Sequence, residues 1–134
     1  MNEVKETSTI QFNKQTVFKL CPVTYVMEKI GSYWKPIILF HLLSGKKRYG
    51  ELKKAMPHIT EKMLAQHLKQ LEADELVLRK ALPVVPPHVT YSLTPAGLAL
   101  RPVLYAMANW AINDGRKKDE PLFKTLENFP MFDS

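Results

Sequence analysis

The sequence predicts a mainly α-helical protein with a small β-ribbon, arranged as a winged helix-turn-helix. The first observation is a pair of short helical patterns separated by a proline, in YGELKKAMPHITEKMLAQHLKQLEA. The second is a change of period directly afterwards, where residues 76–82 and 89–93 are partly β-branched or aromatic. The third is a further apolar helix after these two strands. This order of elements is that of a winged helix-turn-helix.

Length and composition are those of one ordinary globular domain. The chain has 134 residues, of which 46% are hydrophobic, so a core can form without disulfide bonds or structural metal ions. No apolar run approaches the roughly 18 residues of a membrane span, and the N-terminus lacks the apolar centre of a signal peptide. One cysteine cannot form an internal disulfide, so we expect a cytoplasmic protein with no membrane partner. We expect an N-terminal arm over 1–20, the winged domain over 21–113 and a tail over 114–134.

Two predicted helices precede the helix-turn-helix unit. Pro22 suits the first position of a helix, and Gly31 ends that helix. The next helix begins within residues 32–36 and continues to Leu43. Because it is apolar on nearly every side, we expect it to be the buried central helix. His41 lies on it, and we expect this histidine to be packed and hydrogen-bonded in the core.

The helix-turn-helix unit is predicted from its boundaries and from one apolar stripe. The third helix covers residues 49–55, because Pro57 cannot continue it. Thr60 is a natural N-cap for the fourth helix. That helix has a buried stripe at i, i+4 and i+7, formed by Leu64, Leu68 and Leu71.

Two short strands and a stiff tip form the predicted wing. Residues 76–82 and 89–93 are the strands, and the proline-rich PVVPPH between them suits an extended hairpin tip. Thr94 and Pro95 begin the last helix as an N-cap followed by proline at the first helical position. We expect this helix to end near Asn113, with a kink or a break at Pro102.

Positive charge is concentrated around the helix-turn-helix unit. The formal charge of the chain is +6, and residues 46–80 hold nine Lys or Arg against five Asp or Glu, a net +4. Such an excess favours a polyanionic partner, commonly nucleic acid, and we expect double-stranded DNA. The expected phosphate contacts are Lys46, Lys47, Arg48, Lys53, Arg79, Lys80 and His88.

The outward side of the fourth helix has the composition of a base-reading surface. Glutamine can pair with adenine, lysine can bind guanine or phosphate, and a small alanine permits close approach. An ordinary solvated helix is also polar outside, and this alternative stays open for the helix taken alone. The wing and the local charge favour DNA. The expected base contacts are Thr60, Lys62, Ala65, Gln66 and Lys69.

Several motifs, taken in order, resemble those of one family. They are CPV at 21–23, WKPIILFHL at 34–42, RYGELK at 48–53, ITEKML at 59–64, LKQLE at 68–72 and VPPHVTYSLT at 85–94. Over residues 21–110 the chain resembles the HxlR-type branch of MarR-like transcriptional regulators. The resemblance implies a DNA-binding homodimer, built from the N-terminal region and the last helix.

Two positions depart from the family pattern. Glu75 stands where glycine usually follows the recognition helix, and a left-handed residue there costs glutamate more than glycine. The residues before Trp34 are Gly-Ser-Tyr, where the family often has Gly-Gly-Lys.

The last helix is too apolar to be covered on one side only, so we expect a second chain to cover it. The expected dimer contacts are Val23, Met107, Trp110 and Ile112.

Cys21 is the one residue with expected redox chemistry. It precedes Pro22 at a predicted helix N-terminus, where the helix dipole favours thiolate. Several relatives of this type sense electrophiles or oxidants through an N-terminal cysteine, and Cys21 occupies the matching position. The alternative is an inert, packed thiol. The effector, a small molecule or an oxidant, is left open.

No catalytic constellation is visible in the sequence. His41, His58, His67 and His88 lack the spacing of zinc ligands, and we expect the last three at the surface. No Gly-rich phosphate loop and no G-x-S-x-G motif occurs. We expect no enzyme activity, no cofactor and no metal. The remaining alternative is a winged helix used for protein–protein contact without specific DNA binding.

Overall fold

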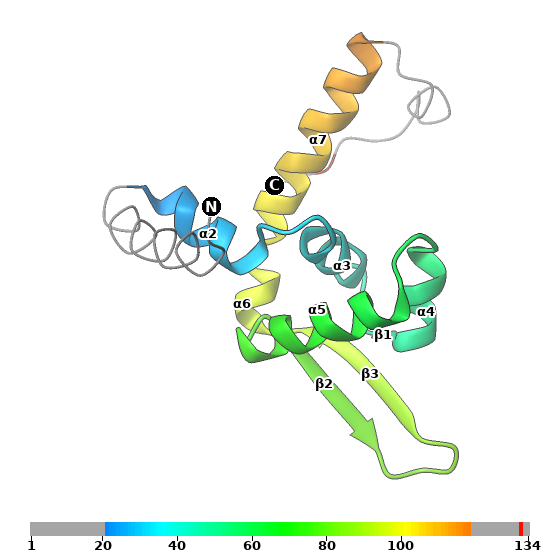
Figure 1. The fold of residues 1–134 in the computed structure, drawn as a ribbon. Helices are drawn as coiled ribbons and strands as arrows, with labels where there is room; N and C mark the ends of the chain where they lie inside the picture. The colour runs from blue at the N-terminus through cyan, green and yellow to red at the C-terminus, as the bar shows by residue number, and fades with distance from the viewer. Residues whose placement is uncertain (1–20, 119–131, 133–134) are drawn as a thin grey trace, which may run out of the picture.

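A computed structural model describes residues 21–118 and Phe132, and Figure 1 shows their arrangement. The predicted arm and most of the predicted tail lie outside the described residues. The order of elements confirms the winged helix-turn-helix. In chain order the elements are α2 (Pro22–Ile30), α3 (Trp34–Leu42), β1 (Lys47–Arg48), α4 (Tyr49–Ala55), α5 (Glu61–Ala73), β2 (Val77–Leu82), β3 (His88–Leu93), α6 (Pro95–Leu98) and α7 (Arg101–Lys117).

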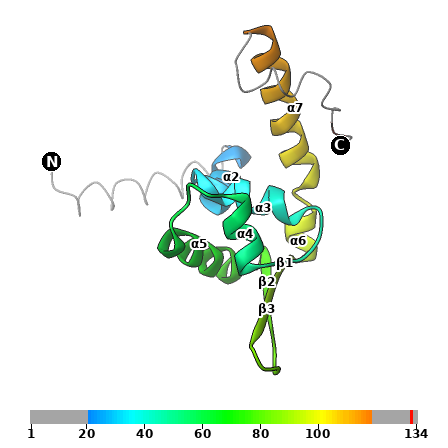
Figure 2. The same cartoon turned by 90° about the vertical axis from the view of Figure 1, so that its right-hand side faces the viewer.

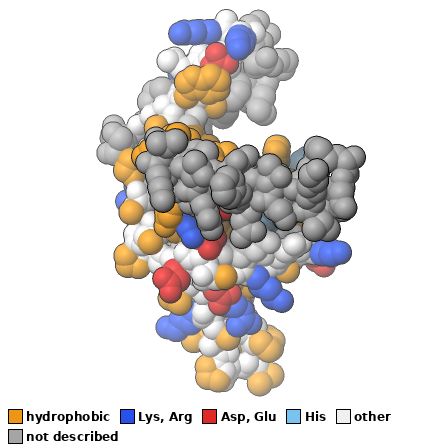
Figure 3. All heavy atoms as spheres, turned by 60° about the vertical axis from the view of Figure 1, so that its left-hand side comes forward, with side chains coloured by type: hydrophobic (Ala, Val, Ile, Leu, Met, Phe, Trp, Pro, Cys, Tyr) orange, Lys and Arg blue, Asp and Glu red, His pale blue; other side chains and the backbone are white. Residues whose placement is uncertain are grey.

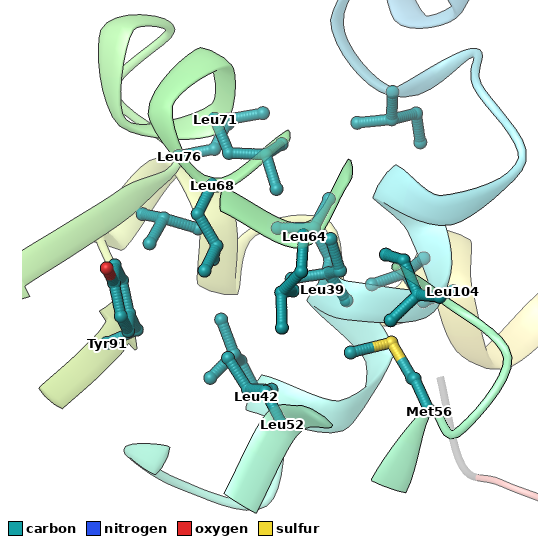
Figure 4. Close-up of a cluster of buried hydrophobic side chains, with 14 residues drawn as sticks. Leu39, Leu42, Leu52, Met56, Leu64, Leu68, Leu71, Leu76, Tyr91 and Leu104 are labelled. Atoms are coloured by element: carbon teal, nitrogen blue, oxygen red, sulfur yellow. The ribbon is translucent and has the colours of Figure 1, made fainter. Parts of the chain in front are cut away.

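The core lies where α3, α5 and the base of the sheet meet (Figure 4). Leu39 of α3 and Leu64 of α5 have no exposed side-chain surface. The predicted stripe on α5 is confirmed, because Leu64, Leu68 and Leu71 are at most 2% exposed. Full burial of one leucine contributes about 1.5–3 kcal/mol. These contacts determine which side of α5 remains available to solvent.

A three-stranded antiparallel sheet takes the place of the predicted two-stranded ribbon. The central strand is β3, which pairs with β2 on one side and with the short β1 on the other. The sequence did not indicate β1, because two residues are too few to show a period. Through β1, the segment that enters α4 is tied directly to the wing.

Side-chain caps begin two helices where they were predicted. Thr60 Oγ1 accepts a hydrogen bond from the N–H of Met63 at 3.1 Å, in the first turn of α5. Thr94 Oγ1 accepts from the N–H of Gly97 at 3.1 Å. The same hydroxyl donates to the carbonyl oxygen of Glu75 at 2.6 Å. Thr94 therefore joins the start of α6 to the turn that follows α5.

The predicted break in the last helix is confirmed. It separates α6 from α7 at residues 99–100. Pro102 lies in the first turn of α7, where a missing N–H costs no intrahelical hydrogen bond. In Figures 1 and 2, α7 and the β2–β3 hairpin extend from opposite sides of the helical body.

The predicted end of the last helix at Asn113 is wrong, because α7 continues to Lys117. An ion pair between Lys118 Nζ and Asp114 Oδ2, 3.1 Å long, joins the last turn of the helix to its C-cap. A cation near a helix C-terminus also interacts favourably with the helix dipole. The predicted division between domain and tail therefore falls inside α7.

The turn between α5 and β2 contains a residue in the left-handed conformation. Glu75 has a φ of 59°, at the position where the family pattern has glycine. A non-glycine residue in this region is disfavoured, because its Cβ approaches the following carbonyl oxygen. The turn is nevertheless held by the hydrogen bond from Thr94 and by the N–H of Leu76, which donates to Leu71 O at 3.0 Å.

Replacement of Glu75 with glycine should stabilise the fold. Relief of the left-handed conformation, about 1–2 kcal/mol, exceeds the extra backbone entropy that glycine loses on folding, about 0.5–1 kcal/mol. We expect the free energy of unfolding in urea titrations to rise by about 0.5–1 kcal/mol. Glu75→Ala keeps the Cβ and serves as the control. An equal rise in both variants would show that side-chain loss, not backbone conformation, is responsible.

Candidate nucleic-acid interface

The outward side of α5 is exposed and has no intrachain polar partner among the described residues. Lys62, Ala65, Gln66 and Lys69 are all exposed, as the sequence predicted. Thr60 is exposed as well, but its Oγ1 already accepts the capping hydrogen bond. Lysine and glutamine side chains in a row on one rigid helix suit the major groove, which is about 12 Å wide.

The register of the sheet sorts the basic residues of the wing into two rows. Lys47, Tyr91 and Arg79 lie opposite one another across the three strands. Arg48, Thr90 and Lys80 form the neighbouring row. Because successive side chains of a strand point to opposite faces, the two rows lie on opposite faces of the sheet.

The row that contains Tyr91 faces the core, since this tyrosine is only 9% exposed. Arg79 and Lys47 therefore lie on the same face of the sheet as α3 and α5. Lys80 and Arg48 lie on the other face. Two basic residues that are adjacent in sequence, Arg79 and Lys80, are thus directed to different sides of the wing.

Arg48 is joined to His88 at the end of the wing. Arg48 Nε donates to His88 Nε2 at 2.7 Å, and Arg48 Nη2 lies 3.0 Å from His88 Nδ1. A neutral imidazole has one acceptor nitrogen, so only one of these two contacts is a full hydrogen bond. The pair connects β1 to the first residue of β3. Two residues that the sequence predicted separately as phosphate contacts therefore form one group.

The remaining predicted phosphate contacts lie at the entrance of the helix-turn-helix. Lys46 is exposed. Lys47 Nζ donates to Ser44 Oγ at 3.1 Å, and Lys53 Nζ approaches the carbonyl oxygen of Pro57 at 3.5 Å. Both hydrogen bonds are at the surface and have neutral acceptors, so each lysine can exchange its partner for water or for a phosphate.

Tyr49 links α4 to the first turn of α5, and the sequence did not indicate this contact. Its hydroxyl donates to the carbonyl oxygen of Glu61 at 3.0 Å. Burial raises the pKa of Tyr49, and the negative charge of Glu61 raises it further. Tyr49 is therefore a neutral donor at neutral pH. Only its place at the start of a short helix could have suggested the contact.

The tip of the wing, residues 83–87, carries no charged side chain. Val85 is completely exposed and Val84 is about half exposed. In Figure 3, hydrophobic side chains gather at the lower end of the molecule, where Figure 1 places the hairpin tip. The cations of the wing therefore lie at its base, while its tip offers only van der Waals surface.

Three of the four residues predicted at a dimer interface are exposed. Val23 is 64%, Met107 49% and Trp110 69% exposed. On α7, Val103 continues the exposed apolar side one turn before Met107. Ile112, in contrast, is 5% exposed, so its side chain is already covered within the chain.

Cys21 is the N-cap residue of α2, and its thiol is free. The pKa of the Cys21 thiol is lowered from its ordinary value, first by the backbone N–H of Val23 and then by that of Thr24. These N–H groups lie in the first turn of α2, where that of Thr24 also donates to the carbonyl oxygen of Cys21 at 3.0 Å, and they favour the thiolate. The sulfur is partly exposed, as a reactive cysteine requires.

The histidines differ in part from their predicted places. His41 is only half buried and makes no side-chain hydrogen bond to the described residues, so the predicted core histidine is wrong. The covered side of α3 is that of Ile38, Leu39 and Leu42 instead. Burial, and then the charge of Lys47, lower the pKa of His41. His67 is half buried as well, not at the surface.

Residues 21–118 and Phe132 contain neither a metal-binding cluster nor a membrane-spanning helix. Within this part of the chain, no group of three or more His, Cys, Asp and Glu residues is placed to hold a metal ion. No helix there combines the length and the apolar character needed to cross a membrane.

Comparisons with known proteins agree with this arrangement. The HxlR-like helix-turn-helix family matches residues 29–119, from the end of α2 to beyond α7. YdeP of Bacillus subtilis, an uncharacterized HTH-type transcriptional regulator, is 45% identical over 93 residues, which are 69% of this chain and 73% of YdeP.

Two solved structures are similar in both fold and sequence. The redox regulator HypR in its reduced form is 40% identical and has a TM-score of 0.68. The match covers 75% of this chain and 98% of the HypR chain. The reduced form of the transcriptional regulator YodB from Bacillus subtilis is 40% identical and has a TM-score of 0.61. The match covers 68% of this chain and 90% of the YodB chain. Both likenesses therefore extend over most of the winged helix.

Removal of the Tyr49 hydroxyl should loosen the helix-turn-helix. Tyr49→Phe loses the hydrogen bond to Glu61, and we expect a loss of about 0.5–1.5 kcal/mol in the free energy of unfolding. The control is Tyr33→Phe, because Tyr33 is 75% exposed, and there we expect a change within about 0.5 kcal/mol. The same small change in both variants would mean that the Tyr49 contact does not hold α4 and α5 together.

Proposed function

The chain belongs to the HxlR-like helix-turn-helix family of transcriptional regulators, whose members bind DNA and are not enzymes, and we propose that it is a homodimer that recognises a pseudo-palindromic operator. The observation that carries this proposal is the exposed side of α5, where Lys62, Gln66 and Lys69 have no partner among the described residues. A regulator of this kind acts where the genome is, so we also propose a cytoplasmic location.

In the proposed complex, α5 enters the major groove. Gln66 pairs with adenine, and Lys62 and Lys69 bind guanine or phosphate. Ala65 touches a thymine methyl group, and Thr60 lies near the entering edge of the groove. Their side chains are carried by a helix whose rotation is set by three buried leucines, so they reach the bases as one rigid set.

The two rows of the wing contact phosphates of different strands or different turns. Arg79 and Lys47 share the face of the sheet with α5, so they bind the backbone that borders the groove occupied by α5. Arg48, with His88, and Lys80 face away and bind the backbone beyond the wing. The uncharged tip then enters the minor groove by shape, without an ion pair.

Substitution of two reading residues should weaken operator binding and relax sequence preference. Lys62→Ala together with Gln66→Ala removes contacts to base edges, and we expect operator affinity to fall by about 1–3 kcal/mol per lost contact. Binding is measured by fluorescence anisotropy on operator and scrambled DNA. Unchanged discrimination in the double variant would mean that α5 is not the reading helix.

Lys47→Ala should instead weaken all DNA sequences about equally, and the slope of log affinity against log salt should become shallower by about one. The matched control is Lys54→Ala, which removes one exposed positive charge from α4 outside the proposed contacts. If both variants change the salt slope equally, the effect comes from net charge and not from a phosphate contact of Lys47.

The second chain of the proposed homodimer covers the exposed apolar side of α7 and the start of α2. Met107 and Trp110 are large apolar side chains that solvent would otherwise surround, and Val23 presents a third. Ile112 is left out of this proposal because it is buried within the chain. A two-fold axis at this contact would place the two α5 helices about 34–36 Å apart, one turn of DNA.

Trp110→Ala should shift the protein from dimer towards monomer. A buried aromatic anchor at an interface contributes about 2 kcal/mol or more, so the dissociation constant should rise by at least about 30-fold. Sedimentation equilibrium measures the change, with Leu82→Ala on the wing as the control. A parent chain that is monomeric at micromolar concentration, or a variant that dimerises as well as the parent, would refute the proposed interface.

We propose that Cys21 makes the regulator responsive to oxidants or electrophiles. The support is its lowered pKa, its partial exposure and its place at the start of α2, beside the proposed dimer contact of Val23. HypR is named a redox regulator, and its structure is similar to this chain. An adduct on Cys21, or a disulfide between two subunits, would change how the subunits meet without touching α5.

The reaction of Cys21 with iodoacetamide should show the lowered pKa. The thiolate is the reactive species, so a lowered pKa gives a larger thiolate fraction at each pH below the ordinary thiol value. The rate should therefore rise at lower pH than for an unfolded peptide of residues 18–26, which is the control. Equal midpoints would leave Cys21 as a packing residue, and so would a Cys21→Ser variant whose operator binding still responds to oxidant.

A further inference from the structure

Phe132 lies in a small site between α3 and α7. Its ring stacks on that of Tyr105, with centroids 4.7 Å apart and planes at 22°. It meets the ring of Phe40 edge-on, with centroids 5.5 Å apart and planes at 87°. Phe40 and Tyr105 also contact each other, at 6.4 Å. Rings from three separate parts of the chain therefore form one cluster, in arrangements that aromatic pairs prefer.

Asn109 binds the backbone of Phe132 on both sides of the residue. Its Nδ2 donates to the carbonyl oxygen of Phe132 at 2.8 Å, and its Oδ1 accepts from the N–H at 2.7 Å. One side chain thus satisfies both polar groups of the docked residue, as a neighbouring strand would. The rings of Phe40 and Tyr105 contact the aromatic side chain of Phe132, and Asn109 binds its backbone N–H and carbonyl oxygen.

The site joins α7 to the helical body at a second place, beyond Leu104 of α7, which is buried in the core cluster. Phe40 belongs to α3, which packs on α5 in the core. Tyr105 and Asn109 lie one turn apart on α7, which extends away from the body in Figures 1 and 2. Met107 and Trp110, two of the exposed apolar residues of α7, lie within the same two turns.

We propose that the chain's own Phe132 docks in this site, defined by Phe40, Tyr105 and Asn109, and holds α7 at a fixed angle to the α3–α5 body. Phe132 is not part of the buried core cluster, so it can leave the site and return without unfolding the core. In a dimer formed through α7, this angle sets the distance between the two α5 helices. That last consequence rests on the proposed function, whereas the docking itself does not.

Residue-resolved amide hydrogen exchange of the full chain tests the docking directly. The N–H of Phe132 should exchange at least about tenfold more slowly than an unprotected amide, since exchange requires the two hydrogen bonds to Asn109 and the ring contacts to open. Asn109→Ala and Tyr105→Leu should each remove most of this protection. Asn113→Ala, one turn further along α7 and exposed, is the matched control and should retain it. Fast exchange of this amide in the parent chain would overturn the proposal.

Mixed dimers separate docking within one chain from exchange between two copies. Isotope-labelled Asn109→Ala chains, which keep Phe132 but lack the complete site, are refolded with unlabelled Phe132→Ala chains, which keep the site. Docking within the chain predicts that the labelled Phe132 amide stays unprotected. Recovered protection would show that the site accepts the segment of a second copy, and would overturn the proposed arrangement.

Selection of DNA from a library of half-site spacings tests the consequence for α7. The parent should select one spacing, and Phe132→Ala should accept at least one further spacing with the same half-site sequence. An unchanged preference, together with confirmed docking, would overturn the role of Phe132 in orienting α7. Absence of any sequence-specific binding by the parent would overturn the proposed function instead, and the exchange result would stand independently.

Discussion

Burial of one side of α5 is the constraint on which the rest of the structure depends. Leu64, Leu68 and Leu71 are at most 2% exposed, and full burial of each contributes about 1.5–3 kcal/mol. Rotation of the helix by one residue would expose them and would turn a polar side chain, Lys69 in one direction or Gln70 in the other, towards the core, which is costly. The buried stripe therefore determines that Lys62 and Gln66 face solvent as a rigid pair. A surface suited to bases is thus a consequence of core packing.

In the sheet, too, burial of one side determines where the other side chains lie, because successive side chains of a strand alternate between its two faces. Burial of Tyr91 assigns Arg79 to the face shared with α5, and strand geometry then assigns Lys80 to the other face. A single charged patch on the wing is excluded by this register. The cations lie at the base, in two rows, and the apolar tip extends beyond them. Charged and apolar side chains are consequently separated along one hairpin.

Two helices lie largely outside this constraint. Ile30 is the only buried residue of α2, and α7 extends from the body with Met107 and Trp110 exposed. Cys21 lies at the start of α2, and Phe132 is docked on α7. A chemical or conformational change at either place could alter how two chains meet while α5 keeps its orientation. Reading of the bases and regulation of the dimer would thus reside in different elements of one small fold.

By itself, the sequence determined the boundaries of the helix-turn-helix unit and the orientation of α5, because prolines, caps and an apolar stripe act over a few neighbouring residues. Residues 49–55 of α4 and the Thr60 cap were predicted correctly for that reason. Three features were not predicted: strand β1, the Arg48–His88 pair and the hydrogen bonds between Asn109 and Phe132. Each depends on residues that are distant in sequence and show no local period. Only the tertiary structure decided them, since a half-buried polar or aromatic side chain has many possible partners until the fold brings one within bonding distance.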